Sequence, residues 1–240
     1  MAKVSAVATN TMTVHAKAVR SAVAMKMLMA VTGLYLVLFL LMHMWGNLKM
    51  FLGPEAFNHY AEWLKSDLLY PIVPHGWFIW IFRFSLVAAI GLHMWSALVL
   101  TGRSHAGRGR YQRTDRRAQT YSARTMRWGG VILALMLLFH IGQFTVRAIQ
   151  TGFNASTAPY DMVVASFSPQ YWWVFVLYAL WMVAVCMHIR HGFWSAFTTL
   201  GMNTSAQARK VLNGLGILVA LLLYFGFMIM PVSVLVGLVK

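Results

Sequence analysis

Four histidines lie inside four separate long apolar stretches of this sequence, at His43, His93, His140 and His188. A titratable side chain in the middle of a membrane helix is costly, so it usually has a functional role. Neutral imidazole is a good iron ligand, and haem iron in proteins is commonly held by histidine. One histidine on each of four helices therefore predicts two pairs of axial ligands for two haems inside a helical bundle.

The bulk composition places these histidines in a membrane protein. Of the 240 residues, 60% are hydrophobic, whereas about 45–50% is usual for soluble domains. A bilayer crossing needs roughly 20 apolar residues, and five stretches are long enough: 24–46, 76–100, 128–150, 171–197 and 212–238. They predict an all-α membrane protein, with one integral domain over residues 1–240 forming a five-helix transmembrane bundle around two haems. The polar first 20 residues and the long first span argue against a cleaved signal peptide.

The cysteine content limits how a haem would be held. Cys186 is the only cysteine, so this chain alone builds neither a disulfide nor an iron–sulfur cluster. No Cys-x-x-Cys-His motif is present in the sequence, so both haems are expected to be held non-covalently, as haem b.

The charge distribution predicts the orientation of the bundle. The formal net charge is +15, and the basic residues gather before the first span, between the second and third spans, and before the fifth. If these segments are cytoplasmic, the positive-inside rule is satisfied, the N-terminus is inside and the C-terminus is outside. Topology and contacts with lipid headgroups account for the arginine cluster at 103–127, so we expect no nucleic-acid partner. Docking of a cytoplasmic partner on part of that loop is a further use of the same cluster.

The depth of each histidine in the membrane predicts how the four would pair. Spans one and three run outward, and His43 and His140 fall in their outer halves. Spans two and four run inward, and His93 and His188 each come about 17 residues into them, in the inner half. The predicted pairs are therefore His43 with His140 near the outside and His93 with His188 near the cytoplasm. For any single histidine, a hydrogen bond to a neighbouring carbonyl or a place in a proton path is the alternative.

Several further residues are candidate haem contacts. His191 lies three residues after His188 on a similar helix face and is the competing ligand there. Thr32 is eleven residues before His43 and lies on nearly the same face. Arg147 follows His140 by seven residues, where it is placed to pair with a propionate at the outer surface. The candidate propionate partners at the inner surface are Arg20, Lys26, Arg124 and Arg127, although snorkelling to lipid headgroups explains any of these cations equally well.

The two predicted external connections differ in character. Residues 54–69 repeat apolar side chains at helical spacing, which predicts a short amphipathic helix in the outer interface. Residues 151–170 contain Gly152, Pro159 and Pro169 and are expected to form a loop.

The motifs around the histidines resemble those of a known family. Thr32-Gly33, then His43-Met44 and Gly46-Asn47-Leu48, are similar to the first helix of the single-chain dihaem cytochrome b subunits of succinate:quinone oxidoreductases. The later matching pieces are GLHMWSA at 91–97 and HIRHGFWSAF at 188–197. The resemblance covers essentially the whole chain, and it rests on the order and spacing of these motifs.

The resemblance implies a function and a set of partners. It implies a membrane anchor in a bacterial cytoplasmic membrane, bound on its cytoplasmic side to a flavoprotein that carries FAD and to an iron–sulfur subunit. Succinate would be oxidised in the flavoprotein, and electrons would pass through two haems b to a membrane quinone, which we expect to be menaquinone. Fumarate reductases of the same family run the reverse reaction. The ligand pairs implied are again His43 with His140 and His93 with His188, and Glu62 and Asp67 are candidates for an acidic quinone and proton site near the distal haem.

Two other function classes remain as alternatives. A cytochrome b anchor of a hydrogenase or formate dehydrogenase also carries histidine pairs in its helices, but its co-purifying subunits would differ. A haem-free transporter or proton channel would use the histidines as relays and would call for carboxylates within the spans. None of the five acidic residues lies in a predicted span, which disfavours this second alternative.

Overall fold

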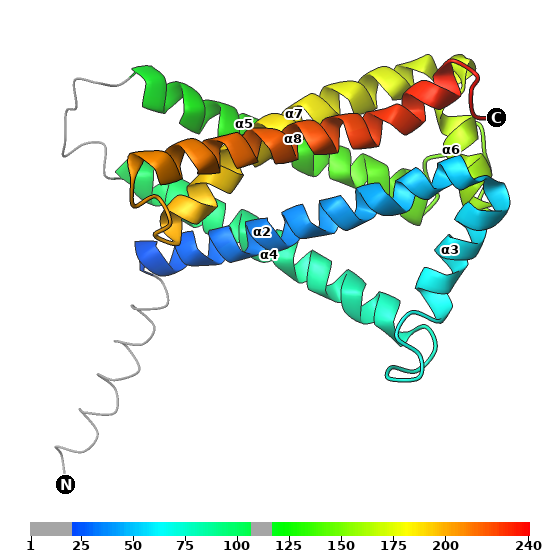
Figure 1. The fold of residues 1–240 in the computed structure, drawn as a ribbon, viewed down its shortest axis with the longest axis horizontal. Coiled ribbons are helices and arrows are strands. Elements are labelled where there is room, and N and C mark those ends of the chain that lie inside the picture. The colour runs from blue at the N-terminus through cyan, green and yellow to red at the C-terminus, as the bar shows by residue number, and fades with distance from the viewer. Residues whose placement is uncertain (1–20, 107–116) are drawn as a thin grey trace, which may run out of the picture.

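The computed structural model describes residues 21–106 and 117–240, with side chains at 21–104 and 126–240, and the described chain is all helix, turn and loop (Figure 1). Five long helices run along the molecule: α2 (Ala22–Leu48), α4 (Trp77–Ala106), α5 (Arg117–His140), α7 (Trp172–Thr199) and α8 (Ala206–Leu235). Short elements lie between them: η1 (Lys49–Leu52), α3 (Pro54–Ser66), η3 (Ile141–Thr145), α6 (Pro159–Phe167) and η4 (Pro169–Tyr171).

Local sequence signals set where several helices begin. The hydroxyls of Ser21 and Ser205 accept hydrogen bonds from the backbone N–H groups of Ala24 and Ala208, which caps α2 and α8. Proline occupies the first turn of α3 and of α6, where its missing N–H leaves no hydrogen bond unmade.

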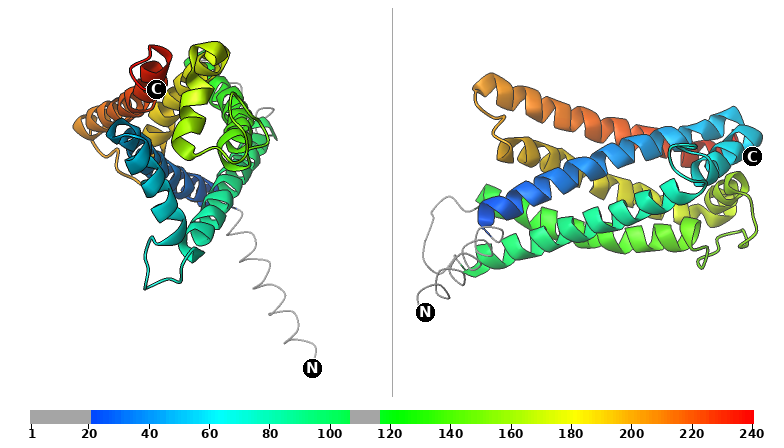
Figure 2. Two further views of the ribbon diagram at one scale, coloured as in Figure 1. Left: turned by 90° about the vertical axis from the view of Figure 1, so that its right-hand side faces the viewer. Right: turned by 90° about the horizontal axis from the view of Figure 1, so that it is seen from below.

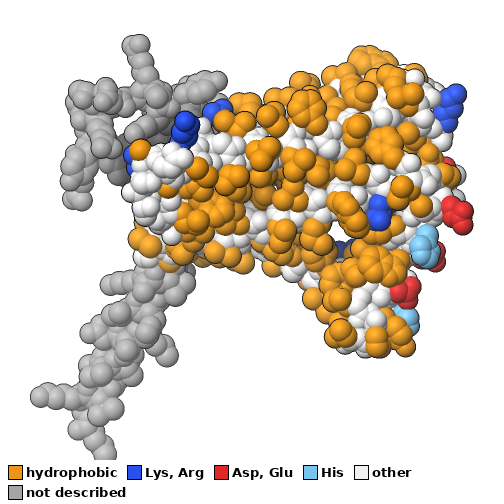
Figure 3. All heavy atoms as spheres, viewed as in Figure 1, with side chains coloured by type: hydrophobic (Ala, Val, Ile, Leu, Met, Phe, Trp, Pro, Cys, Tyr) orange, Lys and Arg blue, Asp and Glu red, His pale blue; other side chains and the backbone are white. Residues whose placement is uncertain are grey.

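Five helices in the described chain are long and apolar enough to cross a membrane, as the sequence predicts. Their outward faces carry large apolar side chains, and Phe84, Leu98, Leu138 and Phe225 are each at least 65% exposed. Figure 3 shows hydrophobic side chains covering the length of the bundle, with acidic side chains at the end where α3 lies. This is the surface of a multi-pass membrane protein, because lipid tails cover such side chains without cost.

The long helices are arranged around α2 and α7 (Figure 2). α2 packs against α4, α7 and α8, and α7 packs against α2, α5 and α8. In the order α4, α2, α7, α5 each helix is next to the following one, so α2 and α5 are opposite each other, as are α4 and α7. α8 lies outside these four, against α2 and α7.

The two ends of the bundle differ in charge, and we name them accordingly. The acidic end is where α2 ends and α4 begins, and it holds Glu55, Glu62, Asp67 and Asp161. The basic end is where α2 begins and α4 ends, and its described basic residues include Lys26, Arg103, Arg127, Arg209 and Lys210.

The connection at 151–170, expected to be a loop, contains the helix α6. Its Tyr160, Met162, Val163 and Phe167 are all buried. Tyr160, Val163 and Phe167 belong to a core cluster at the acidic end that also contains Phe57 of α3. Proline at 159 starts this helix instead of breaking one, so the residue that suggested a loop is a helix N-terminus.

The third span ends before the sequence suggests. Regular α-helix stops at His140, and a π-helical turn over Ile141–Thr145 follows, closed by the Val146 N–H donating to the Ile141 carbonyl at 2.8 Å. Arg147 then adopts φ +63°, which is incompatible with a continuing helix. The predicted stretch 128–150 is therefore too long at its C-terminal end, because apolar residues continue into the loop.

Candidate functional site

The first histidine pair lies toward the acidic end. His43 of α2 and His140 of α5 face each other across the bundle, with ring centroids 5.9 Å apart and ring planes at 84°. Aromatic side chains surround the pair: Phe39 stacks on His43 at 5.3 Å, and Trp181 lies 5.7 Å from His140. The two histidines come from helices on opposite sides of the four-helix arrangement, so both side chains point inward.

The second pair lies toward the basic end and uses the other diagonal. His93 of α4 and His188 of α7 have ring centroids 6.2 Å apart and ring planes at 63°. Each pair thus joins two opposite helices, and together the two pairs use all four helices once. The structure brings together the same partners that the sequence pairs by depth.

The spacing of the two pairs along the bundle follows from their neighbours. Thr32 of α2 contacts His93 and lies eleven residues before His43. At 1.5 Å per residue this puts the two levels about 16 Å apart. Along α7, Tyr178 contacts His140 and lies ten residues before His188, which gives about 15 Å. The two independent measures agree.

The geometry of each pair fits one metal ion between two imidazoles. A metal–imidazole bond is about 2 Å long, so two rings on opposite sides of one ion have centroids roughly 6 Å apart. Both observed separations match this distance. Within the described residues, no group of three or more His, Cys, Asp or Glu side chains is placed to hold a metal ion.

The hydrogen bonds of His93 involve its Nδ1 and leave its Nε2 able to bind a metal. Its Nδ1 lies 3.2 Å from the Met29 carbonyl oxygen and 3.3 Å from the Thr32 hydroxyl. A carbonyl only accepts, so Nδ1 carries the proton and Nε2 keeps its lone pair. Metal-binding histidines usually donate their other ring N–H in this way.

Two buried polar atoms next to the pairs have no hydrogen-bond partner among the described residues. They are Nδ1 of His188 and Nε1 of Trp181, whose ring packs on His140. Buried donors and acceptors are nearly always paired, so each atom calls for a partner that the described residues do not supply. The unpartnered atoms and the ring spacing are the observations on which a ligand assignment at the two pairs has to rest.

Gly33 gives His93 its position. A Cβ at residue 33 would lie 3.1 Å from Cε1 of His93, so any side chain there would require the ring to shift by at least a few tenths of an ångström away from α2. By contrast, a Cβ added at Gly91, on the helix of His93, would meet no atom within 4 Å.

The other predicted haem contacts lie in different settings. Thr32 is buried and donates to the Leu28 carbonyl at 2.7 Å. Its hydroxyl contacts His93, although its spacing in the sequence related it to His43. His191 is exposed and lines a groove of about 280 Å³ with Arg190 and Asn213, whereas His188 is the ring that faces His93. Lys26 is exposed on α2 and Arg127 is half-buried on α5, both at the basic end. Arg20 and the side chain of Arg124 lie outside what the structure describes.

Arg147 has a different setting from the one its spacing suggested. The helix ends before it, so it does not continue the face of His140. Its guanidinium donates to the carbonyls of Ala155 and Thr157 and so holds the following loop. Its role as a propionate partner stays a prediction.

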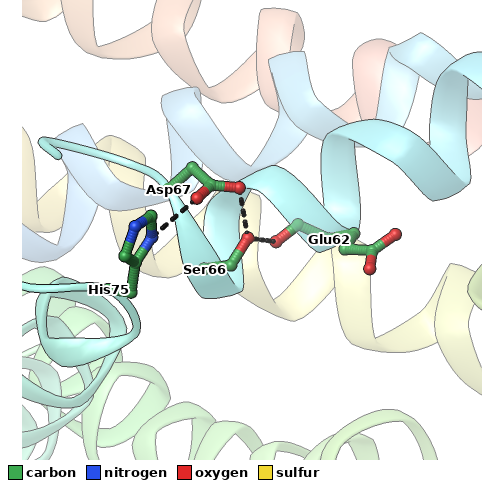
Figure 4. A network of polar contacts seen from close by, with 4 residues as sticks. All are labelled: Glu62, Ser66, Asp67 and His75. Carbon is green, nitrogen blue, oxygen red and sulfur yellow. Dashed lines mark hydrogen bonds and ion pairs between the residues drawn. The ribbon is translucent and has the colours of Figure 1, made fainter.

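The acidic candidates lie at the surface of the acidic end. Asp67 accepts hydrogen bonds from the Ser66 hydroxyl at 2.6 Å and pairs with His75 at 2.8 Å, whereas the Glu62 carboxylate points away from them (Figure 4). The bond from Ser66, aided by nearby His75, holds the pKa of Asp67 below its usual range. Both acids are exposed, and their place in a quinone site stays a prediction.

Sequence reasoning missed a group of polar residues beside His140. Tyr178, Gln143, Thr151 and Ser166 are all buried and linked by hydrogen bonds. The available signal was Gln143, a neutral polar residue three positions after a predicted ligand in an apolar stretch.

Comparisons of the chain with protein-family profiles, with curated proteins and with solved structures found no match. The geometry of the two histidine pairs and the motifs of the sequence are therefore the basis for assigning a function.

Proposed function

We propose that this chain is a dihaem membrane cytochrome b, the anchor and electron-transfer subunit of a succinate:quinone oxidoreductase. The observation that carries the haem assignment is the pair of inward-facing histidine couples, at 5.9 and 6.2 Å, on the two diagonals of one four-helix bundle. The family assignment rests on the resemblance of the motifs around those histidines.

In this proposal His43 and His140 hold the haem toward the acidic end, and His93 and His188 hold the haem toward the basic end. Each bound haem supplies a one-electron carrier. The chain's own residues fix the ligand nitrogens, exclude water with aromatic and aliphatic side chains, and set the two levels about 16 Å apart. That arrangement carries electrons from one face of the membrane toward the other.

The partners follow from the polarity of the bundle and from the resemblance. The basic end would face the cytoplasm and the flavoprotein and iron–sulfur subunits, so the pair His93 and His188 would receive electrons first. A membrane quinone, menaquinone by our expectation, would be the electron acceptor. Glu62 and Asp67 lie at the acidic end and are the candidate acids for its protons.

Haem content of histidine variants tests the assignment and the pairing together. Wild type should bind two haems b per chain, and alanine at any one of the four histidines should remove one, measured by haem quantification and reduced-minus-oxidised spectra. The double variant His43→Ala/His140→Ala should lose no more than one haem, because both residues hold the same group. The double variant His43→Ala/His93→Ala should lose both.

The control is His59→Ala, an exposed histidine of α3 that should leave two haems. Two haems retained in the His93→Ala or His188→Ala variant would contradict the ligand assignment. No haem in the wild type would overturn the function and favour the transport alternative. In the purified complex, succinate should reduce at least one haem, and haems reduced only by dithionite would point to a different electron donor.

A further inference from the structure

A buried chain of hydrogen bonds runs from His140 into the loop at the acidic end. Nδ1 of His140 lies 3.1 Å from the Tyr178 hydroxyl, which donates to Oε1 of Gln143 at 2.8 Å. Nε2 of Gln143 then donates to the hydroxyls of Thr151 at 2.7 Å and Ser166 at 3.2 Å. We call Tyr178, Gln143, Thr151 and Ser166 the Gln143 network.

The network is buried, and each of its four side chains has at least one hydrogen-bond partner within it. Gln143 and Ser166 are 0% exposed and Thr151 is 3% exposed. Both N–H donors and the carbonyl oxygen of the Gln143 amide are used, and Thr151 and Ser166 also bond each other at 2.9 Å. Burying four polar side chains in a membrane bundle is costly unless all are paired, so this is a strongly specified arrangement.

The fold departs from a regular helix where the network begins. Gln143 sits in the middle of the π-helical turn Ile141–Thr145, directly after His140. The wider turn shifts the direction of side chains after His140 and lets Gln143 meet Tyr178 of α7 and Ser166 of α6. Single π-helical turns of this kind are frequent at functional sites.

The direction of the hydrogen bonds sets the proton on His140. The single O–H of Tyr178 is given to Gln143, so toward His140 the Tyr178 oxygen can only accept. Nδ1 of His140 must therefore carry a proton, and Nε2 is left with its lone pair. The other pair reaches the same state more simply, through the Met29 carbonyl at His93.

We propose that the Gln143 network is a positioning device for His140: it fixes the Nδ1–H tautomer and strengthens the ligand as an electron donor. This inference rests on the proposed function, since it assigns His140 as a haem ligand. An imidazole that donates from Nδ1 is a more basic ligand and favours the oxidised metal. The network thus lowers the potential of the haem at the acidic end relative to the same ligands without it.

The decisive variant is Tyr178→Phe. It removes one oxygen and keeps the ring that packs on Phe167 at 5.2 Å and Trp181 at 5.5 Å, so the bundle should fold. We expect the haem that is lost in His140→Ala to become easier to reduce, with its reduction equilibrium shifted up to about tenfold, which is about 59 mV for a one-electron couple. The affinity of the chain for that haem should fall about tenfold. The other haem should keep its reduction potential. Gln143→Leu should act in the same direction.

The matched control is Tyr35→Phe. Like Tyr178, Tyr35 lies in a spanning helix and its hydroxyl is hydrogen-bonded. Its partner is Ser85 at 2.7 Å and not a histidine. This variant should leave both potentials unchanged. If the network only stabilises the fold, Tyr178→Phe should lower stability without changing the potential of one haem selectively. Unchanged potentials in Tyr178→Phe would overturn the proposal.

A second measurement does not need haem. In the haem-free full chain with ¹⁵N-labelled histidine, the His140 signal, assigned by its loss in His140→Ala, should show Nδ1 protonated and Nε2 bare. The opposite tautomer would overturn the positioning role whether or not haem binds. Failure of the wild type to bind haem would instead count against the proposed function, so the two failures are distinguishable.

Discussion

At the scale of single residues, each histidine pair has one ring held by the protein and one ring less constrained. His93 is fixed by the Met29 carbonyl, and His140 by Tyr178. Nδ1 of His188, the partner of His93, is buried and has no hydrogen-bond partner among the described residues. If the proposed function is right, the fixed ring of each pair would set where the iron lies, and the second ring would adjust to it.

The position of His93 depends on glycine at residue 33. Gly33→Val would place a branched side chain where a Cβ alone comes to 3.1 Å from His93, so the ring must move away from Met29 and Thr32. We expect the affinity for the haem at the basic end to fall at least about tenfold, leaving about one haem per chain. Haem quantification and the reduced spectrum measure this result. Gly91→Ala, which meets no atom within 4 Å, is the control and should keep two haems; two tightly bound haems in Gly33→Val would contradict the role of this glycine.

At the scale of elements, the five long helices and the short helix α3, expected over 54–69 and found over Pro54–Ser66, were predictable, whereas α6 and the π-helical turn were not. Five apolar stretches predict five spanning helices because burial in lipid requires length and apolarity, which the sequence records directly. The π-helical turn and α6 depend on tertiary contacts, since Gln143 finds its partners only when Ser166 and Tyr178 are brought beside it. The histidine pairs were predictable from depth alone, whereas the Gln143 network was not.

The connection between α3 and α4 is held by a surface ion pair whose strength depends on pH. Asp67 and His75 pair at 2.8 Å, and the ring of Tyr70 stacks on His75 at 3.9 Å. The folded pKa of Asp67 is lowered, so its contribution is present above the unfolded value of about 3.9 and is lost as pH falls through the lower folded value. Asp67→Asn should speed amide hydrogen exchange in residues 67–76 about twofold to fivefold near pH 6.

That effect of Asp67→Asn should shrink as the pH is lowered toward about 2, because the wild-type carboxylate is then protonated as well. Glu62→Gln is the control, since its exposed carboxylate points away from the pair (Figure 4). An exchange difference that is independent of pH would mean that the charge of Asp67 does not hold this connection.

At the scale of the whole molecule, charge and apolar surface divide the bundle into three zones. Acidic side chains gather at one end, an apolar belt covers the helices (Figure 3), and the basic residues Lys26, Arg103, Arg127, Arg209 and Lys210 of the described chain lie at the other end. This polarity decides which haem faces the succinate-oxidising partners in the proposed complex. It also decides on which side of the membrane Glu62 and Asp67 lie.

Labelling of single cysteines tests the orientation. Cys186 is the only cysteine, and its thiol is half-buried and donates to the Ala220 carbonyl at 3.0 Å, so Cys186→Ser gives a background without thiols. In that background, exposed Glu62 at the acidic end and exposed Thr204 at the basic end are each changed to cysteine. Because lysine and arginine near span ends are retained in the cytoplasm, a membrane-impermeant maleimide should label Glu62→Cys in intact spheroplasts and Thr204→Cys only after lysis. The reverse pattern would invert the bundle and place the His43 and His140 pair nearest the cytoplasm, and labelling of both in intact spheroplasts would contradict an odd number of crossings between them.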